Sequence, residues 1–172
     1  DKITANEDAA AIIPAGPDSV ILAVADGAGG LPHGDAAAAI AIDSLVAEVR
    51  KCDPVALRVG IVNGFETANA AICDQLPGAA TTLLVTEITN RTVRTYHAGD
   101  SGACIIGGRG KSKAYTQFHS PTGYAVEAGM LSEQEAMLHQ DRHFVSNVLG
   151  DMNMFVEIGT ATKLAPRDTI VI

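Results

Sequence analysis

An apolar stretch that ends in an acid and a group of glycines is the feature that most constrains this chain. Residues 20–25 read Val-Ile-Leu-Ala-Val-Ala, and Asp26-Gly27-Ala28-Gly29-Gly30 follows directly. A run rich in Val, Ile and Leu is typical of a strand buried on both faces. Glycines suit a turn with a positive φ or a backbone that a ligand approaches closely. The stretch therefore predicts a strand with Asp26 at its mouth, where the carboxylate either holds a hard cation or only bonds the turn amides.

The segment before this strand predicts its partner. Residues 9–13 are apolar, and residues 14–18 contain the Pro and Gly of a turn. The two apolar segments are therefore expected to pair as an antiparallel hairpin. In such a hairpin Asn6-Glu7-Asp8 stands at the start of one strand and Asp26 at the end of the other. These two places share one edge of the sheet, so the acids are expected to lie together.

The rest of the chain predicts helices and further hairpins. Asp35 can cap a helix over about 35–51, and Asp53-Pro54 can start another that ends near 75. We expect these helices to pack antiparallel on one sheet and to bury the following side chains: Ile42, Leu45, Val46, Val49, Leu57, Ile61, Phe65, Ala68 and Ile72. Gly60 and Gly64 suggest close packing between elements.

Strands and turns dominate the remaining sequence. Hairpins are expected around Asn90-Arg91 and around 107–110, a surface segment without clear periodicity over 119–131, and strand candidates over 155–161 and 169–172. Ser132 and Glu135 form a capping box, and residues 147–150 are expected to close a further helix. Because helices and strands do not alternate regularly, the pattern favours an α+β fold with antiparallel sheets covered by helices.

Composition excludes several classes of function. The 172 residues fit one domain and carry a net charge of −8 without a basic run, which argues against binding to nucleic acid or to an anionic membrane. No apolar stretch has the length of a membrane span, and the first residues do not resemble a signal peptide. The three cysteines lack metal-ligand spacing, so we expect reduced thiols in a cytoplasmic protein.

Three acids occupy turns between apolar strands: Asp8, Asp26 and Asp100. Gly27 and Gly99 leave the backbone beside two of them accessible. Such a set suggests a shared carboxylate site for Mg²⁺ or Mn²⁺. The sequence shows no obvious pair of nucleophile and base, which agrees with this hypothesis because bound cations generate a nucleophile from water.

These segments resemble, in order, the motifs of the 2C-type metal-dependent serine/threonine protein phosphatases, also called the PPM family, and bacterial members in particular. The matching segments are Asn6-Glu7-Asp8-Ala9, Val24-Ala25-Asp26-Gly27-Ala28-Gly29-Gly30, Ala80-Thr81-Thr82-Leu83, His97-Ala98-Gly99-Asp100-Ser101, Ser146-Asn147-Val148-Leu149-Gly150, and Asp168-Thr169-Ile170-Val171-Ile172. The resemblance implies a four-layer α-β-β-α sandwich, in which two antiparallel sheets are flanked by helix pairs.

The resemblance also implies roles for individual residues. Asp26 would bridge two Mn²⁺ or Mg²⁺ ions and is the expected catalytic group, and the Gly27 carbonyl would bind one of these ions. Asp8, assisted by Glu7, would hold a metal directly or through water, and Asp100 would serve a third position. Residues 119–131 match the family's variable flap beside the cleft.

Several departures from the family pattern affect these expectations. The family has two further metal aspartates that would follow Ile172, and its first strand would begin before Asp1, so residues 1–172 are expected to be one phosphatase domain that is incomplete at both ends. A phosphate-binding arginine would fall near Ile3, where Lys2 is the only cation nearby; the substrate-binding residues therefore stay unknown. Ala28 replaces a histidine that donates a proton in some members.

The histidines leave two alternatives for His33 and one expectation for the others. His33 is either an exposed loop residue or a substitute proton donor. The other four are expected to be structural: His97, His119, His139 and His143.

The resemblance implies hydrolysis of phosphoserine and phosphothreonine in proteins, with a Ser/Thr kinase and its substrates as partners. The alternative is a catalytically inactive member that keeps the sandwich and acts as a regulatory binding module. Encoded residues beyond Ile172 would separate the two, because a Ser-Asp-Gly followed later by Asp-Asn indicates the enzyme.

Overall fold

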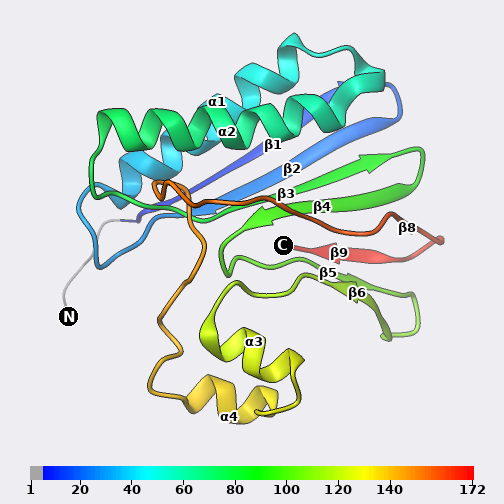
Figure 1. The fold of residues 1–172 in the computed structure, drawn as a ribbon. Coiled ribbons are helices and arrows are strands. Elements are labelled where there is room, and N and C mark those ends of the chain that lie inside the picture. Colours follow the sequence, from blue (N-terminus) through cyan, green and yellow to red (C-terminus); the bar gives the residue numbers. More distant parts are fainter. Residues whose placement is uncertain (1–5) are drawn as a thin grey trace.

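The computed structural model describes residues 6–172 of the chain (Figure 1). The expectation for Lys2 and Ile3 therefore lies outside the described residues. The helices are α1 (Gly34–Lys51), α2 (Leu57–Gln75), α3 (Pro121–Glu127) and α4 (Glu133–Leu138), with a 3-10 turn at Pro54–Ala56. The strands are β1 (Asp8–Gly16), β2 (Ser19–Asp26), β3 (Leu83–Thr89), β4 (Thr92–Ala98), β5 (Cys104–Ile106), β6 (Ser112–Tyr115), β7 (Glu157–Ile158), β8 (Thr162–Lys163) and β9 (Thr169–Val171).

The strands form two antiparallel sheets, which confirms the expected α+β class. The larger sheet has the order β1-β2-β3-β4-β7, with β8 also paired to β4, and the smaller has the order β6-β5-β9. The β3–β4 hairpin turns at Asn90 and Arg91, whose φ values are 48° and 58°. Positive φ at both central residues matches the right-handed twist of the strands. The first hairpin places Asp8 opposite Asp26, as the sequence predicted.

Helices α1 and α2 cover one face of the larger sheet (Figure 1). They run antiparallel, since Gly64 of α2 lies against Leu45 of α1 whereas Gly60 lies against Cys52, which follows α1. A Cβ at Gly64 would come within 2.9 Å of Leu45 Cδ1, so these glycines allow the two helices to approach closely. This confirms the predicted close packing.

The core lies between this helix pair and the larger sheet. Of the helix side chains predicted to be buried, only Val46 is partly exposed. The others are buried: Ile42, Leu45, Val49, Leu57, Ile61, Phe65, Ala68 and Ile72. Burial of such a side chain contributes about 1.5–3 kcal/mol, so the spacing in the sequence identified the main source of stability.

Three local predictions were wrong. The residue that precedes α1 is His33, in a left-handed conformation, and Asp35 lies in the first turn. Residues 147–150 do not form a helix, because the backbone of Leu149 pairs with Thr81 instead. Residues 119–131 are not a surface segment throughout: His119 is fully buried, and α3 begins two residues later.

Helices α3 and α4 contact each other and lie on the opposite side of the sheets from α1 and α2 (Figure 1). Ser120 caps α3 by accepting the Gly123 N–H at 3.0 Å. The capping box of Ser132 and Glu135 starts α4, as predicted. Among the described residues, no helix is both long enough and apolar enough to cross a bilayer. We refer to residues 120–145, which include both helices, as the flap segment.

Candidate functional site

Asp8 and Asp26 face each other across the first hairpin. They occupy the first position of β1 and the last position of β2, and the antiparallel register makes them direct partners. Burial raises the pKa of Asp26, and a side-chain hydrogen bond with Asp8 together with the Asp8 charge raises it further. The charges of Asp100 and Glu7 act in the same direction. Acids from two other segments of the chain, residues 7–8 and Asp100, therefore act on Asp26 at one edge of the sheet.

The backbone of Asp26 is held by two threonines. Its N–H donates to Thr82 Oγ1 at 3.0 Å. Its carbonyl accepts from Thr81 Oγ1 at 2.9 Å and from the Thr82 N–H at 2.9 Å. Thr82 Oγ1 also lies 2.6 Å from Ser101 Oγ, in the loop that carries Asp100. The loops after β2 and β4 are thus joined through Thr82. This residue belongs to the matching segment Ala80-Thr81-Thr82-Leu83, but the sequence predicted no role for it.

Gly27 is required by packing. A Cβ at Gly27 would come within 2.4 Å of the Gly34 backbone at the start of α1 and 2.8 Å from the Glu7 carbonyl. The Gly27 N–H donates to that same carbonyl at 3.2 Å. The residue thus brings the start of α1, the loop after β2 and the segment before β1 together. Its predicted role as a metal ligand through its carbonyl stays a prediction.

One oxygen of Glu7 has no partner. Glu7 Oε2 is buried and accepts no hydrogen bond. It lies beneath the loop after β2, since a Cβ at Gly34 would approach it to 2.6 Å and a Cβ at Gly29 to 3.5 Å. A buried carboxylate oxygen without a donor is costly for a folded protein. A bound cation would remove that cost.

Asp100 lies in the loop after β4. Burial raises the pKa of its carboxyl group, while a hydrogen bond from its own backbone amide lowers it. The next two residues, Ser101 and Gly102, line an open cleft of about 280 Å³ together with Asp8, Val24, Ala25, Asp26 and Ile172. Asp8 and Asp26 thus line the cleft, and Asp100 directly precedes two residues that line it. The metal site that these three acids were predicted to share stays a prediction. We call Glu7, Asp8, Asp26 and Asp100 the acidic cluster.

The acidic cluster fits a divalent cation. Its donors are carboxylate oxygens, which Mg²⁺ and Mn²⁺ prefer. The pKa of Asp26 is raised by burial and then by three neighbouring carboxylates, whose charges oppose ionisation of Asp26 in the absence of a counter-ion. Together with the orphaned oxygen of Glu7, this repulsion is what a bound cation would offset. The assignment of individual ligands stays a prediction.

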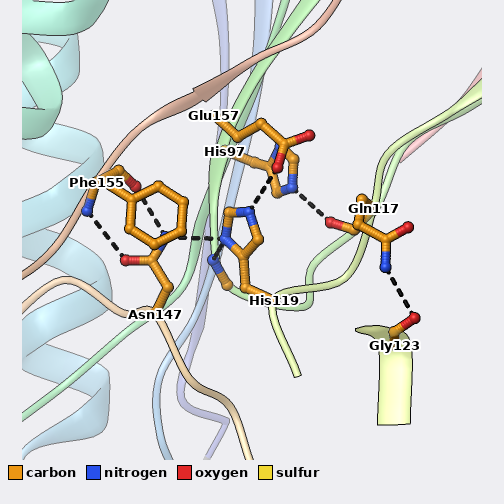
Figure 2. Close-up of polar contacts among 8 residues, drawn as sticks. His97, Gln117, His119, Gly123, Asn147, Phe155 and Glu157 are labelled. Atoms are coloured by element: carbon orange, nitrogen blue, oxygen red, sulfur yellow. Dashed lines mark hydrogen bonds and ion pairs between the residues drawn. The ribbon is translucent and has the colours of Figure 1, made fainter. Parts of the chain in front are cut away.

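A second cluster of ionisable side chains lies beside the acidic cluster. His97, His119 and Glu157 present ligand atoms within 4.8 Å of one another, and among residues 6–172 they are the only three such side chains that meet this criterion. The two imidazole rings stack with centroids 4.4 Å apart (Figure 2). We call these three residues and Asn147 the histidine cluster. Both histidines are structural on the expectation from sequence, which predicts no role for Asn147 or Glu157.

His33 precedes helix α1 and lies outside the lining of the cleft. The residue is exposed. Its left-handed backbone, with φ 61°, and its lack of a capping bond describe a loop residue that precedes α1. The alternative role of His33 as a proton donor stays a hypothesis.

Comparison with known proteins agrees with this geometry. The family model of protein phosphatase 2C matches residues 2–149. The serine/threonine phosphatase of S. agalactiae superposes with a TM-score of 0.84 at 23% identity, over 99% of this chain and 73% of that one. For Stp1 of Staphylococcus aureus the TM-score is 0.82 at 22% identity, over 94% of this chain and 66% of that one. No curated protein matches the chain in sequence.

A third structure contains metal. The catalytic domain of the serine/threonine protein phosphatase PstP, in complex with two manganese ions, superposes with a TM-score of 0.74 at 23% identity, over 96% of this chain and 69% of that one. At these identities the structural likeness shows the fold. The family model covers most of the chain and decides membership: the chain belongs to the protein phosphatase 2C family.

Proposed function

We propose that the protein is a metal-dependent phosphatase that removes phosphate from phosphoserine and phosphothreonine in other proteins. The observation that carries this proposal is the group of carboxylates around Asp26. Asp8 and Asp26 line one cleft, the charges of Asp100 and Glu7 act on Asp26, and one buried oxygen of Glu7 has no partner. The family and the fold support the reaction class. The physiological partners would be phosphorylated substrates of a Ser/Thr kinase. Three free thiols agree with action in a bacterial cytoplasm.

The residues of this chain would act by binding the metal ions and by orienting the carboxylates that hold them. Asp26 would bridge two Mn²⁺ or Mg²⁺ ions, and the two threonines that bind its backbone keep its carboxylate at the cleft. The Gly27 carbonyl, Asp8 and Glu7 would complete these positions, and Asp100 would hold a third. Divalent cations in such a site supply an activated water and neutralise charge on phosphoryl oxygens.

The test uses the protein as it is encoded in full, with p-nitrophenyl phosphate and a phosphothreonine peptide as substrates and Mn²⁺ added. Asp26→Asn should lower kcat/KM by about 10²–10³-fold, the usual effect of removing one group that stabilises the transition state. Asp43→Asn, the same change on the exposed side of α1, is the matched control and should keep full activity. Calorimetry with Mn²⁺ should show that Asp26→Asn weakens binding.

The results separate the proposal from its alternative. A wild-type protein that binds Mn²⁺ but hydrolyses neither substrate would be a regulatory binding module. Equal activity of Asp26→Asn and the wild type would show that the acidic cluster does not carry the reaction.

A further inference from the structure

His119 stands at the junction of the acidic cluster and the flap segment. It is fully buried and directly precedes Ser120, the residue that caps α3. At the other end of the flap segment, the Ser146 N–H donates to the His119 carbonyl at 2.8 Å. The flap segment therefore starts and ends at His119. Toward the cleft, the His119 N–H donates to the Gly99 carbonyl at 3.1 Å, next to Asp100.

The hydrogen bonds of Asn147 show which nitrogen of His119 carries the proton. Asn147 Oδ1 accepts the Phe155 N–H at 3.1 Å, and Nδ2 donates to the Phe155 carbonyl at 2.8 Å (Figure 2). Because a backbone amide only donates and a carbonyl only accepts, this pair sets the orientation of the Asn147 amide. The second hydrogen of Nδ2 points to His119 Nδ1 at 2.8 Å.

His119 Nδ1 receives a second donor, the Gly99 N–H at 3.2 Å. A ring nitrogen that accepts hydrogen bonds carries no proton, so the proton of this imidazole is on Nε2. Nε2 lies 3.0 Å from Glu157 Oε2 and donates to it. The contact between His119 and Glu157 is therefore a hydrogen bond of a neutral ring.

This arrangement excludes a metal site at the histidine cluster as the structure stands. A histidine that binds a metal through Nε2 donates its Nδ1 proton to an acceptor. Here Nδ1 faces two N–H donors, so loss of the Nε2 proton would leave an anionic ring. His97 is committed as well, because its Nε2 lies 2.7 Å from the Gln117 carbonyl and can only donate to it. The short distances among the three side chains reflect hydrogen bonding and stacking.

We propose that His119 is a positioning residue that sets the place of Asp100 through the Gly99 backbone. Its Nδ1 holds the Gly99 N–H, and its own N–H holds the Gly99 carbonyl. Gly99 has a φ of 121°, and a Cβ there would come within 2.6 Å of Thr82. Thr82 in turn bonds the Asp26 amide. His119 thus fixes Gly99, the residue before Asp100, in close contact with Thr82, which bonds the Asp26 amide.

This inference rests on the proposed function for the role of Asp100, but the bond itself is testable without activity. Long-range ¹H–¹⁵N spectra of the metal-free protein should show His119 Nδ1 without a proton and Nε2 with one. In Glu157→Gln the side chain keeps an oxygen that accepts from Nε2, so both ring signals and the Gly99 amide signal should stay in place. Titration with Zn²⁺ should leave the two ring-nitrogen signals of His119 unchanged; the Gly99 amide is not used in this titration, because it lies next to Asp100 of the acidic cluster. A protonated Nδ1, or a Zn²⁺ site that Glu157→Gln abolishes, would overturn the proposal.

Two substitutions at His119 separate positioning from simple packing. In Asn the amide oxygen takes nearly the place of Nδ1 and can accept the Gly99 N–H, whereas Gln places its amide near Nε2. His119→Gln should lower kcat/KM and Mn²⁺ affinity by about 10–100-fold, the usual effect of removing a group that orients a metal ligand. His119→Asn should recover most of that loss, with the same thermal stability as His119→Gln. Equal losses in the two variants would contradict a positioning role.

A double-mutant cycle tests the route through Asp100. If His119 acts through Asp100, His119→Gln should cost less than about 2-fold in an Asp100→Asn background. A full loss in that background would overturn the route. If the wild type hydrolyses no phosphate ester, the proposed function fails, and the cycle is then measured on the Gly99 amide shift and on Mn²⁺ affinity. If both substitutions at His119 prevent folding, the tautomer and Glu157→Gln spectra still decide.

Discussion

The acidic cluster and the histidine cluster lie on either side of the Gly99–Asp100 turn, yet their polar groups are satisfied in opposite ways. In the acidic cluster, Glu7 Oε2 is buried without a partner, and burial together with neighbouring carboxylates raises the pKa of Asp26. In the histidine cluster, both ring nitrogens of His119 are partnered. Carboxylate oxygens without donors agree with the cation site proposed above, whereas a satisfied hydrogen-bond network agrees with a supporting role.

His97 is the partial exception in the histidine cluster. Its Nδ1 is buried without a hydrogen-bond partner. Burial lowers the pKa of His97, and the neighbouring His119 lowers it further, while the bond to Gln117 and the Glu157 charge raise it. A neutral His97 that stacks on His119 agrees with a supporting role, because a charged ring would be desolvated there.

The largest expected effect comes from the turn that joins the two clusters. Gly99→Ala should lower the free energy of unfolding by about 2–4 kcal/mol, since it adds backbone strain at φ 121° to a clash with Thr82. Gly110→Ala is the matched control: φ is 77° there, and nothing lies within 4 Å of the added Cβ. Chemical denaturation should therefore show a loss of only about 1 kcal/mol for the control. Similar losses at both positions would mean that close packing on Thr82 contributes nothing.

Removing Asn147 from the hydrogen-bond network of the histidine cluster should lower the free energy of unfolding by nearly as much. Asn147→Ala leaves the Phe155 backbone groups and His119 Nδ1 without their partner, which should destabilise the fold by about 1–3 kcal/mol in urea unfolding. Asn153→Ala, on an exposed turn, should change stability by less than about 0.5 kcal/mol. A neutral effect of Asn147→Ala would remove the contrast between the two clusters.

Removing a charge from the acidic cluster should leave the stability of the metal-free protein unchanged or raise it slightly, unlike the two substitutions above. Asp8→Asn removes one of the charges that raise the pKa of Asp26, so an NMR titration of the Asp26 carboxyl should show a lower pKa than in the wild type. The metal-free variant should melt at the same temperature as the wild type or about 1–2 °C higher, a small gain because the site is open to solvent. Its affinity for Mn²⁺ should fall. A clear loss of metal-free stability would show that Asp8 supports the fold.

The smallest expected effect is a decline of stability with rising pH, which added Mn²⁺ should offset. Asp26 and Asp100 have raised pKa values in the folded state, so their contribution to stability is complete below the usual range of aspartate. It is lost as the pH rises through the folded pKa values. Scanning calorimetry of the protein in EDTA should show this decline, and Asp26→Asn should flatten it. Mn²⁺ at neutral pH should restore the lost stability, and a profile that EDTA and Mn²⁺ leave identical would argue against a cation at the acidic cluster.

His97 should affect the same curve of stability against pH, but with the opposite dependence on pH. Its lowered pKa means that the folded state favours the neutral ring, so its contribution is complete above the usual histidine pKa. That contribution is lost as the pH falls through the folded pKa. Metal should not affect this part of the curve, which separates the two clusters in one experiment.

Local sequence patterns determined much of the fold and the gathering of the acids. Apolar spacing identified the buried faces of α1 and α2, because a helix that covers a sheet must bury one stripe. The first hairpin placed Asp8 beside Asp26, because antiparallel pairing brings a strand start next to a strand end. Asp100 was identified by its place in a small-residue turn after a strand. These are local or nearest-neighbour relations, which periodicity and turn chemistry encode.

The tertiary structure alone decided how the site is supported. His119 and Asn147 are 28 residues apart, and they meet where Ser146 bonds the His119 carbonyl and Leu149 pairs with Thr81. Helix propensity and capping signals could not indicate this pairing, since its partners come from distant segments. The same reason explains why residues 119–131 resembled a surface segment: a buried histidine whose hydrogen bonds are all made by distant residues leaves no periodic trace in the sequence. Local sequence patterns thus determined which acids lie near one another, and long-range hydrogen bonds decided which residues support them.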